Sequence, residues 1–321
     1  MTTAVQNRPT STVAGIRWHR PLLVLAAAMG VLVVVCLVGL VVDPRESLGV
    51  NVWEKPLKFA ISTAVYAVTW SWLIGQLQRF QRVAWWAGTI SAILLLIELV
   101  IITGAAAAGI TSHFNVSTPV STALWSIMAA SIGTLWVATF VVSIILFRNP
   151  LGDRARTLAI RAGALIALAG MALAFLMTGP TAAQLDDWQG IAGAHTVGLA
   201  DGGPGLPLLG WSTVAGDLRI PHFIGMHALQ VIPLALILIE LAARRIAVLR
   251  DVDVRYRLVA IVSAAYVAVL AVLTSQALRG QSIVAPDAAT ATATLVIAAL
   301  ALAAAAAVVL LQRQLHHRTA V

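Results

Sequence analysis

Histidine, acidic and arginine side chains gather in three short stretches of an otherwise apolar chain, and these side chains can bind metal ions or transfer protons. The stretches are TSHFNVSTP (111–119), GDLRIPHFIGMHALQ (216–230) and SQALRGQ (275–281). Neutral imidazoles are good ligands for zinc, copper and iron, and they also exchange protons near neutral pH. The first hypothesis is therefore a transition-metal or haem site, with His227 as the inner ligand and His113 or His222 completing it.

Three residues are candidates for catalysis. His227 lies within an apolar segment, where an ionisable side chain is costly and normally faces a bundle interior or a wet cavity. Glu98, in LLLIELVII, and Asp217 would relay protons or hydrogen-bond to the ligands of the site. Gln230 follows His227 by about one helical turn, so we expect its amide to orient the imidazole.

His195, Arg219 and Arg279 are the candidates for holding a cofactor or an anion. Arg219 stands beside a predicted helix start, where its planar guanidinium and the helix dipole together favour anions. The structural alternative for Arg219 is a salt bridge with Asp217. Arg279 has a structural alternative too, as the partner of Glu98.

Common metal and nucleotide motifs are absent from the sequence. His222 and His227 are five residues apart, about 140° around a helix, so they cannot chelate one ion as an i, i+4 pair would. The HExxH zinc pattern, GxGxxG and the Walker pattern do not occur. The sequence has one cysteine, Cys36, which lies in an apolar run. Because a disulfide framework and a cysteine zinc site each need more than one cysteine, both are excluded.

The stretch NVWEKPLKFA (51–60) places Glu54, Lys55 and Lys58 where an apolar segment begins. One interpretation is a helix start, with Glu54 near the positive end of the dipole and the lysines extending toward lipid headgroups. The other is a site in which Glu54 or Lys55 pairs across the bundle. The sequence leaves both interpretations open.

Long apolar segments position these residues. The chain has 321 residues, of which 60% are hydrophobic and 11% charged, and its mean hydropathy is +0.91, so it is a membrane protein. Eight runs are long enough to cross about 30 Å of hydrocarbon as helices. They are 21–42, 56–76, 83–103, 119–147, 157–178, 222–241, 256–276 and 288–311. We predict an all-α polytopic bundle of eight transmembrane helices.

The distribution of basic residues predicts the orientation of this bundle. With the amino terminus in the cytoplasm, 16 of the 21 basic residues fall in cytoplasmic segments, which satisfies the positive-inside rule. Both termini are then cytoplasmic, and the polar site faces the extracytoplasmic side of a bacterial inner membrane. Because this distribution accounts for the basic residues, the pI near 10.9 needs no nucleic-acid partner. The five arginines from Arg244 to Arg257 would also contact anionic lipid at the cytoplasmic face.

A single domain is predicted between two tails. Residues 1–20 and 312–321 would be cytoplasmic tails, and 21–311 the transmembrane domain. The connection 179–221 is too long for an ordinary loop, so we expect a packed outer cap that carries His195 and Asp201.

The segments NVWEKPLKFA, HFN, GDLRIPHFIGMHALQ and QALRGQ, in this order, resemble those of a group of uncharacterised bacterial multi-pass membrane proteins. The likeness covers most of the chain from Asn51 to Gln281. It implies a membrane location, but no ligand or catalytic role, because the group has no assigned activity.

Three functions remain open. The first is a membrane enzyme or redox protein that binds a metal or haem at its histidines. The second is a transporter or solute-binding protein that recognises a small anion through Arg219, Arg279 and Lys55. In the third, the polar cluster serves folding alone and the cap binds another membrane protein. The extracytoplasmic partner is thus a small molecule or a protein.

Overall fold

The structure is a computed structural model that describes residues 17–319, with side chains up to residue 314. Its long helices are α1 (Arg20–Val42), α2 (Glu54–Gln76), α3 (Gln81–Ala107), α4 (Pro119–Phe147), α5 (Arg154–Ala172), α7 (Arg219–Met226), α8 (Ala228–Ala242), α9 (Val252–Leu278) and α10 (Ala288–Thr319). The short helices are α6 (Ala182–Asp186), η2 (Leu173–Met177) and η3 (Ala247–Arg250). Two small antiparallel pairs complete it, β1 (Glu46–Ser47) with β2 (Val50–Asn51) and β3 (Thr196–Val197) with β4 (Gly216–Asp217). The predicted all-α fold is confirmed.

The predicted apolar runs also form helices. Seven helices in the described part are long and apolar enough to cross a membrane, and α7 with α8, bent by 47°, forms an eighth span if the pair is counted as one. Helix α10 continues to Thr319, so the predicted tail after residue 311 begins as helix. Many apolar side chains on the outward surface are exposed, among them Val41 and Leu302 at 86% and 73%. Such a surface suits lipid rather than water.

Local sequence explains where several helices start. Pro119 opens α4, where its missing N–H costs nothing, and the Thr118 hydroxyl caps the helix by accepting from Ser121 N at 3.1 Å. Asp153 caps α5 in the same way. His19 was expected in a polar tail, but it is buried and caps α1, with its Nδ1 accepting from Leu22 N at 3.3 Å.

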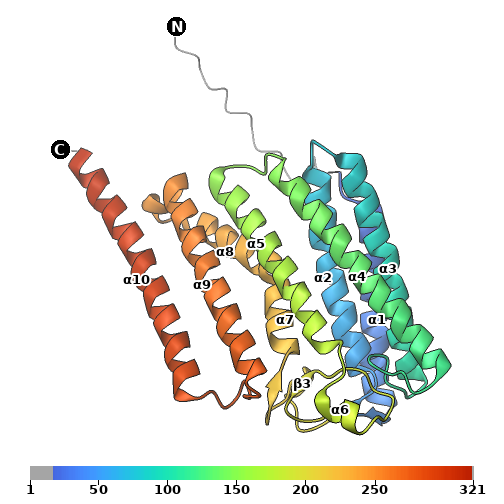
Figure 1. The fold of residues 1–321 in the computed structure, drawn as a ribbon. Helices are drawn as coiled ribbons and strands as arrows, with labels where there is room; N and C mark the ends of the chain where they lie inside the picture. Colours follow the sequence, from blue (N-terminus) through green and yellow to red (C-terminus); the bar gives the residue numbers. More distant parts are fainter. Residues whose placement is uncertain (1–16, 320–321) are drawn as a thin grey trace.

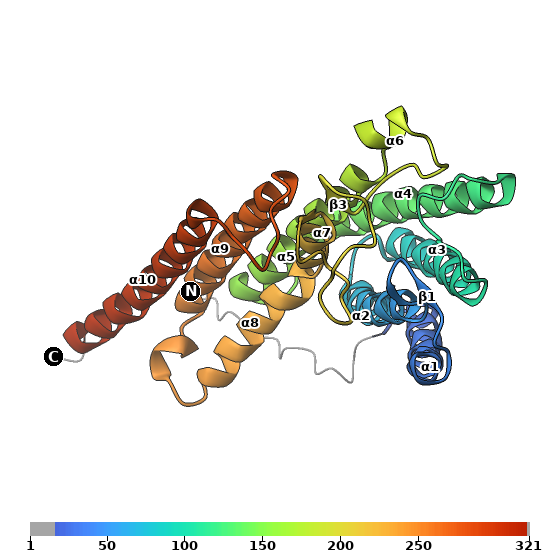
Figure 2. The same ribbon diagram turned by 90° about the horizontal axis from the view of Figure 1, so that it is seen from below.

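The helices form two groups that lie side by side (Figure 1). Helices α1 to α4 pack around one apolar core, and α5 joins them to α7, α8 and α9. Helix α10 lies at the far edge against α9, which Figure 2 shows most clearly. The two groups meet where α4 packs against α5.

The two ends of the bundle differ in character. The cap end holds the β1–β2 hairpin, the connection 108–118 and the connection 178–218, which contains α6, β3 and β4. The opposite end, here called the arginine end, holds the connections 77–80, 148–153 and 243–251. The first and last described residues both lie at the arginine end (Figure 1), in agreement with an even number of spans.

Candidate functional site

Ionisable side chains converge at the cap end from α2, α3 and the two connections that cover them. We call Lys55, Glu98, His113, His195 and Asp201 the cap cluster. Lys55 stands in the first turn of α2, and Glu98 lies on α3 about two and a half turns before that helix ends. The other three belong to the cap-end connections. Helix starts and loops therefore bring together residues that are far apart in the sequence.

Glu98 and His113 form the buried centre of the cap cluster. Glu98 Oε1 lies 3.8 Å from His113 Nε2, and the Glu98 side chain is only 2% exposed. This separation is too long for a hydrogen bond. Glu98 Oε2 is buried and has no hydrogen-bond partner among the described residues. The prediction that Arg279 pairs with Glu98 was wrong, because His113 is the residue that lies next to the Glu98 carboxyl group.

Aromatic rings enclose His113. Its ring centroid lies 5.6 Å from those of Phe59 and Trp125 and 5.9 Å from that of Phe114. The Ser112 hydroxyl is 3.1 Å from His113 Nδ1. Burial, followed by the positive charges of Lys55 and His195, lowers the pKa of His113 well below its ordinary value. His113 is therefore neutral at pH 7.

Lys55 is the cation of the cap cluster without a bonded partner. Its side chain is partly buried, and its ammonium has no hydrogen bond or ion pair with another described residue. It nevertheless interacts electrostatically with Glu98 and Asp201, and with the guanidinium of Arg219. Three donor positions on this ammonium are thus available to a ligand.

His195 and Asp201 form a tight pair in the cap. His195 Nδ1 lies 2.6 Å from Asp201 Oδ2, and Asp201 Oδ1 accepts from the backbone N–H groups of His195 and Thr196 at 3.0 and 2.9 Å. Burial alone would raise the pKa of Asp201, but the bonds from His195 and the backbone outweigh it and hold that pKa below its ordinary value. The ionised Asp201 shapes the cap loop.

Arg219 and Lys58 hold the cap to the helices. Arg219 Nε donates to Asp217 Oδ1 at 2.9 Å, and its Nη2 donates to Gly210 O at 2.6 Å. Asp217 has no exposed side-chain surface and also accepts from Ser212 N. Lys58 Nζ donates to Leu209 O at 3.1 Å. The structural alternative for Arg219 is confirmed, and both cations are bonded to backbone carbonyls of the cap loop.

Arg279 lies outside the cap cluster. Its guanidinium donates to Ser275 Oγ at 2.6 Å and to Thr290 Oγ1 at 2.7 Å, and it lies 3.9 Å from Asp287. Hydrogen bonds from Thr290 lower the pKa of Asp287 to about 2. Arg279 therefore links α9 to the start of α10 rather than facing the predicted site.

His222 of α7 and His227, which follows that helix, contact other partners. His222 Nδ1 lies 2.9 Å from Gly170 O of α5. His227 sits at the break between α7 and α8, with Nδ1 3.3 Å from Gln230 Oε1 and Nε2 3.5 Å from Ser62 Oγ. The predicted contact between Gln230 and His227 is confirmed. Gln230 Nε2 in turn donates to Thr69 Oγ1 at 3.1 Å.

The metal hypothesis gains no support from this arrangement. Within residues 17–314, no three His, Cys, Asp or Glu side chains take positions that could hold one ion. The predicted ligands His113, His222 and His227 instead contact Glu98, Gly170 and Gln230. A haem or metal site stays a prediction that these contacts do not favour.

A polar face on α2 connects the cap cluster with His227, and the sequence interpretation missed it. It consists of Lys55, Lys58, Ser62, Tyr66 and Thr69, which recur at the helical spacing of three or four residues. That spacing was the signal that could have revealed the face. Toward the arginine end, the buried hydroxyls on α3 and α4 mostly donate to carbonyls of their own helix. They are satisfied without a ligand.

The cap cluster therefore combines one unbonded ammonium, one buried carboxyl oxygen without a donor and a neutral imidazole. These groups can bind a small polar solute and exchange a proton with it. Comparisons of this chain with protein-family models, with curated proteins and with solved structures find no match.

Proposed function

We propose that this is a multi-pass protein of the bacterial inner membrane, with its cap end outside the cell and its termini in the cytoplasm. Its apolar helices and exposed apolar surface support the location. The orientation is supported by the basic residues, most of which belong to the arginine end. The cap cluster then faces the extracytoplasmic side.

We further propose that the cap cluster binds a small anion, as in a transporter or a solute-binding membrane protein. The observation that carries this is Lys55, a cation beneath the cap that makes no hydrogen bond or ion pair with a described residue. Ionisable groups in such places are costly and mark ligand sites by default. The neighbouring cations Lys58 and Arg219 are already bonded to the cap backbone.

The buried carboxyl group of Glu98 indicates which chemical groups a solute bound at the cap cluster would carry. Leaving a buried acceptor without a donor costs about 1–3 kcal/mol, so Glu98 Oε2 either carries a proton itself or meets a donor from the ligand. A small carboxylate or phosphate that also carries a hydroxyl or amino group meets both requirements. Its anionic oxygens accept from Lys55, and its donor reaches Glu98.

The broken helix favours transport over simple binding. Transporters commonly place their solute site beside discontinuous helices. Helix α7 has eight residues and is about 12 Å long, so the 47° break at His227 lies well inside the bundle. The polar face of α2 runs from Lys55 past Ser62 to this break. It supplies a polar route from the cap cluster into the protein.

The test is solute binding by the purified full-length protein in mild detergent. Small carboxylates and phosphates are screened by tryptophan fluorescence, because Trp125 packs against His113, and hits are measured by calorimetry. We expect Lys55→Met to weaken binding at least about tenfold, the loss of one charge-assisted bond. Arg148→Gln, a charge change at the arginine end, is the control and should bind as the wild type does.

Two results would contradict the proposal. One is a Lys55→Met variant that binds every hit with unchanged affinity. The other is a near-stoichiometric transition metal or a Soret absorption band in the purified protein. A bound metal or a Soret band would instead support the hypothesis that the histidines hold a cofactor.

A further inference from the structure

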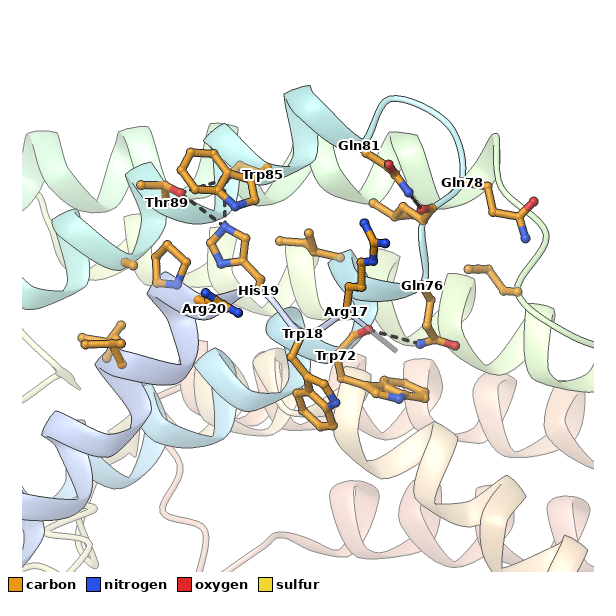
Figure 3. A pocket seen from close by; sticks show the side chains of 18 of the residues that line it. Arg17, Trp18, His19, Arg20, Trp72, Gln76, Gln78, Gln81, Trp85 and Thr89 are labelled. Atoms are coloured by element: carbon orange, nitrogen blue, oxygen red, sulfur yellow. Dashed lines mark hydrogen bonds between the residues drawn. The ribbon is translucent and has the colours of Figure 1, made fainter. Parts of the chain in front are cut away.

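A groove of about 1520 Å³ opens at the arginine end, on the side of the bundle away from the cap. It is lined by the start of α1, the end of α2 and the start of α3 (Figure 3). Arg17, Trp18 and Arg20 stand at its mouth, whereas Val24, Ala28 and Leu96 line it farther along α1 and α3. One end is thus cationic and aromatic, and the other is apolar.

The cations at the mouth are available to a ligand. Arg17 and Arg20 are exposed, and neither forms a hydrogen bond or ion pair through its side chain with another described residue. Arg156, which also borders the groove, is held by Glu240, with its Nε 2.9 Å from Glu240 Oε1. The acidic residue among the lining residues, Asp153, is paired with Arg255 at 3.2 Å, and residues 1–16 contain no acidic side chain.

His19 fixes the backbone between the two arginines. It is 2% exposed, its Nε2 lies 2.9 Å from Trp85 O of α3, and its carbonyl accepts from Ser71 Oγ of α2 at 3.0 Å. Figure 3 shows the imidazole directed toward Trp85 and Thr89. The backbone that carries Arg17 and Arg20 is therefore held in place, which reduces the conformational entropy lost when both side chains bind one ligand.

We propose that this groove binds one anionic phospholipid, with the phosphate at Arg17 and Arg20 and an acyl chain along α1 and α3. Tryptophans such as Trp18 are favoured at the headgroup level, and arginines there attract anionic lipid. From Arg20 to Ala28 the groove follows α1 for about 12 Å, far enough to leave the headgroup region. This site rests on the proposed membrane location and is independent of the anion site at the cap.

Lipid retention tests the headgroup contact. Delipidated full-length protein is incubated with phosphatidylglycerol or phosphatidylcholine in detergent, separated by gel filtration and analysed for bound lipid by mass spectrometry. We expect about tenfold preference for phosphatidylglycerol, lost in the double variant Arg17→Gln, Arg20→Gln. The matched control, Arg244→Gln with Arg245→Gln, removes two exposed arginines at the same end and should keep the preference. Equal retention by both double variants would overturn the proposal.

A second arm distinguishes the lipid from a water-soluble phosphate. Inorganic phosphate at about 10 mM should leave phosphatidylglycerol bound, because it gains nothing from the apolar part of the groove. Displacement by inorganic phosphate would assign the arginines to a soluble anion and overturn the proposal.

Photo-crosslinking identifies the occupant of the apolar part. A photoreactive amino acid replaces the exposed Ala28, in vesicles of about one part phosphatidylglycerol to four parts phosphatidylcholine. We expect adducts enriched at least threefold in phosphatidylglycerol, and bulk proportions at Val100, an exposed position on α3 outside the groove. Crosslinks to residues 1–16 or to a second copy, or bulk proportions at Ala28, would overturn the lipid assignment.

Discussion

Single residues at the cap end differ in whether they are bonded to the cap loop, and Lys55, which is not, is the residue proposed to bind a ligand. Arg219 with Asp217, and Lys58 with Leu209, attach the cap loop to α7 and α2. Lys55 has the same charge and nearly the same position in the sequence as Lys58, yet it has no bonded partner among the described residues. Charge and spacing alone could not separate the two lysines, because the difference depends on where the cap loop places its carbonyls.

The neutral state of His113 predicts a stability that depends on pH. Its folded-state pKa lies below the unfolded value of about 6.5, so the unfolded chain binds protons more strongly as pH falls. The contribution of His113 is therefore complete above pH 6.5 and is lost as pH falls below it, by up to about 1.4 kcal/mol per pH unit. Thermal unfolding followed from pH 8 to pH 5 should show this decrease.

The variant His113→Gln isolates this effect. Glutamine keeps a polar side chain but does not titrate, so the loss of stability between pH 6.5 and pH 5 should be smaller than in the wild type. His195 also has a pKa lowered by burial, opposed by Asp201, and its contribution stays in both proteins. Identical pH profiles would show that His113 does not titrate as proposed.

At the scale of elements, glycines decide how closely α7 approaches α5. A methyl group at Gly170 would lie 2.2 Å from the backbone of Gly225, which no real contact allows. This close approach sets the position of α7, and His222 reaches Gly170 O because of it. The two glycines lie 55 residues apart in the sequence, and nothing in the local pattern of either predicts their contact.

Gly170→Ala should therefore destabilise the protein and displace α7. Overpacking at a tight contact typically costs about 1–3 kcal/mol, and backbone on both sides leaves little room to relax. Gly133→Ala on α4 is the matched control, because no atom lies within 4 Å of the added methyl group. It should be neutral or slightly stabilising, since alanine favours helix. Unfolding temperatures measured in detergent compare the two, and equal values would contradict the packing argument.

At the scale of the whole molecule, the two proposed binding sites lie at opposite ends of the bundle. At the cap end, a loop held by Arg219 and Lys58 covers the proposed anion site, and the arginine end presents the groove of Arg17 and Arg20. Both assignments depend on the same orientation, with the arginine end in the cytoplasm. Orientation is therefore the property of the whole protein to test first.

Cysteine labelling in intact bacterial cells tests it. In a Cys36→Ala background, Leu199→Cys marks the cap and Arg244→Cys marks the arginine end, and both positions are exposed. We expect a membrane-impermeant maleimide to label Leu199→Cys in intact cells and Arg244→Cys only after permeabilisation. The opposite pattern would reverse the orientation and move the cap cluster to the cytoplasm.

The sequence by itself determined the helices, because hydrocarbon-length apolar runs, prolines and capping residues act locally. The run 119–147 coincides with α4, and the run 222–241 contains the break at His227 that local pattern did not predict. Only the tertiary structure decided which polar groups meet. Glu98 contacts His113 rather than Arg279, and His19 is buried rather than solvated, because packing of distant segments selects the partners. Contacts between segments far apart in the chain leave no periodic signal in one sequence.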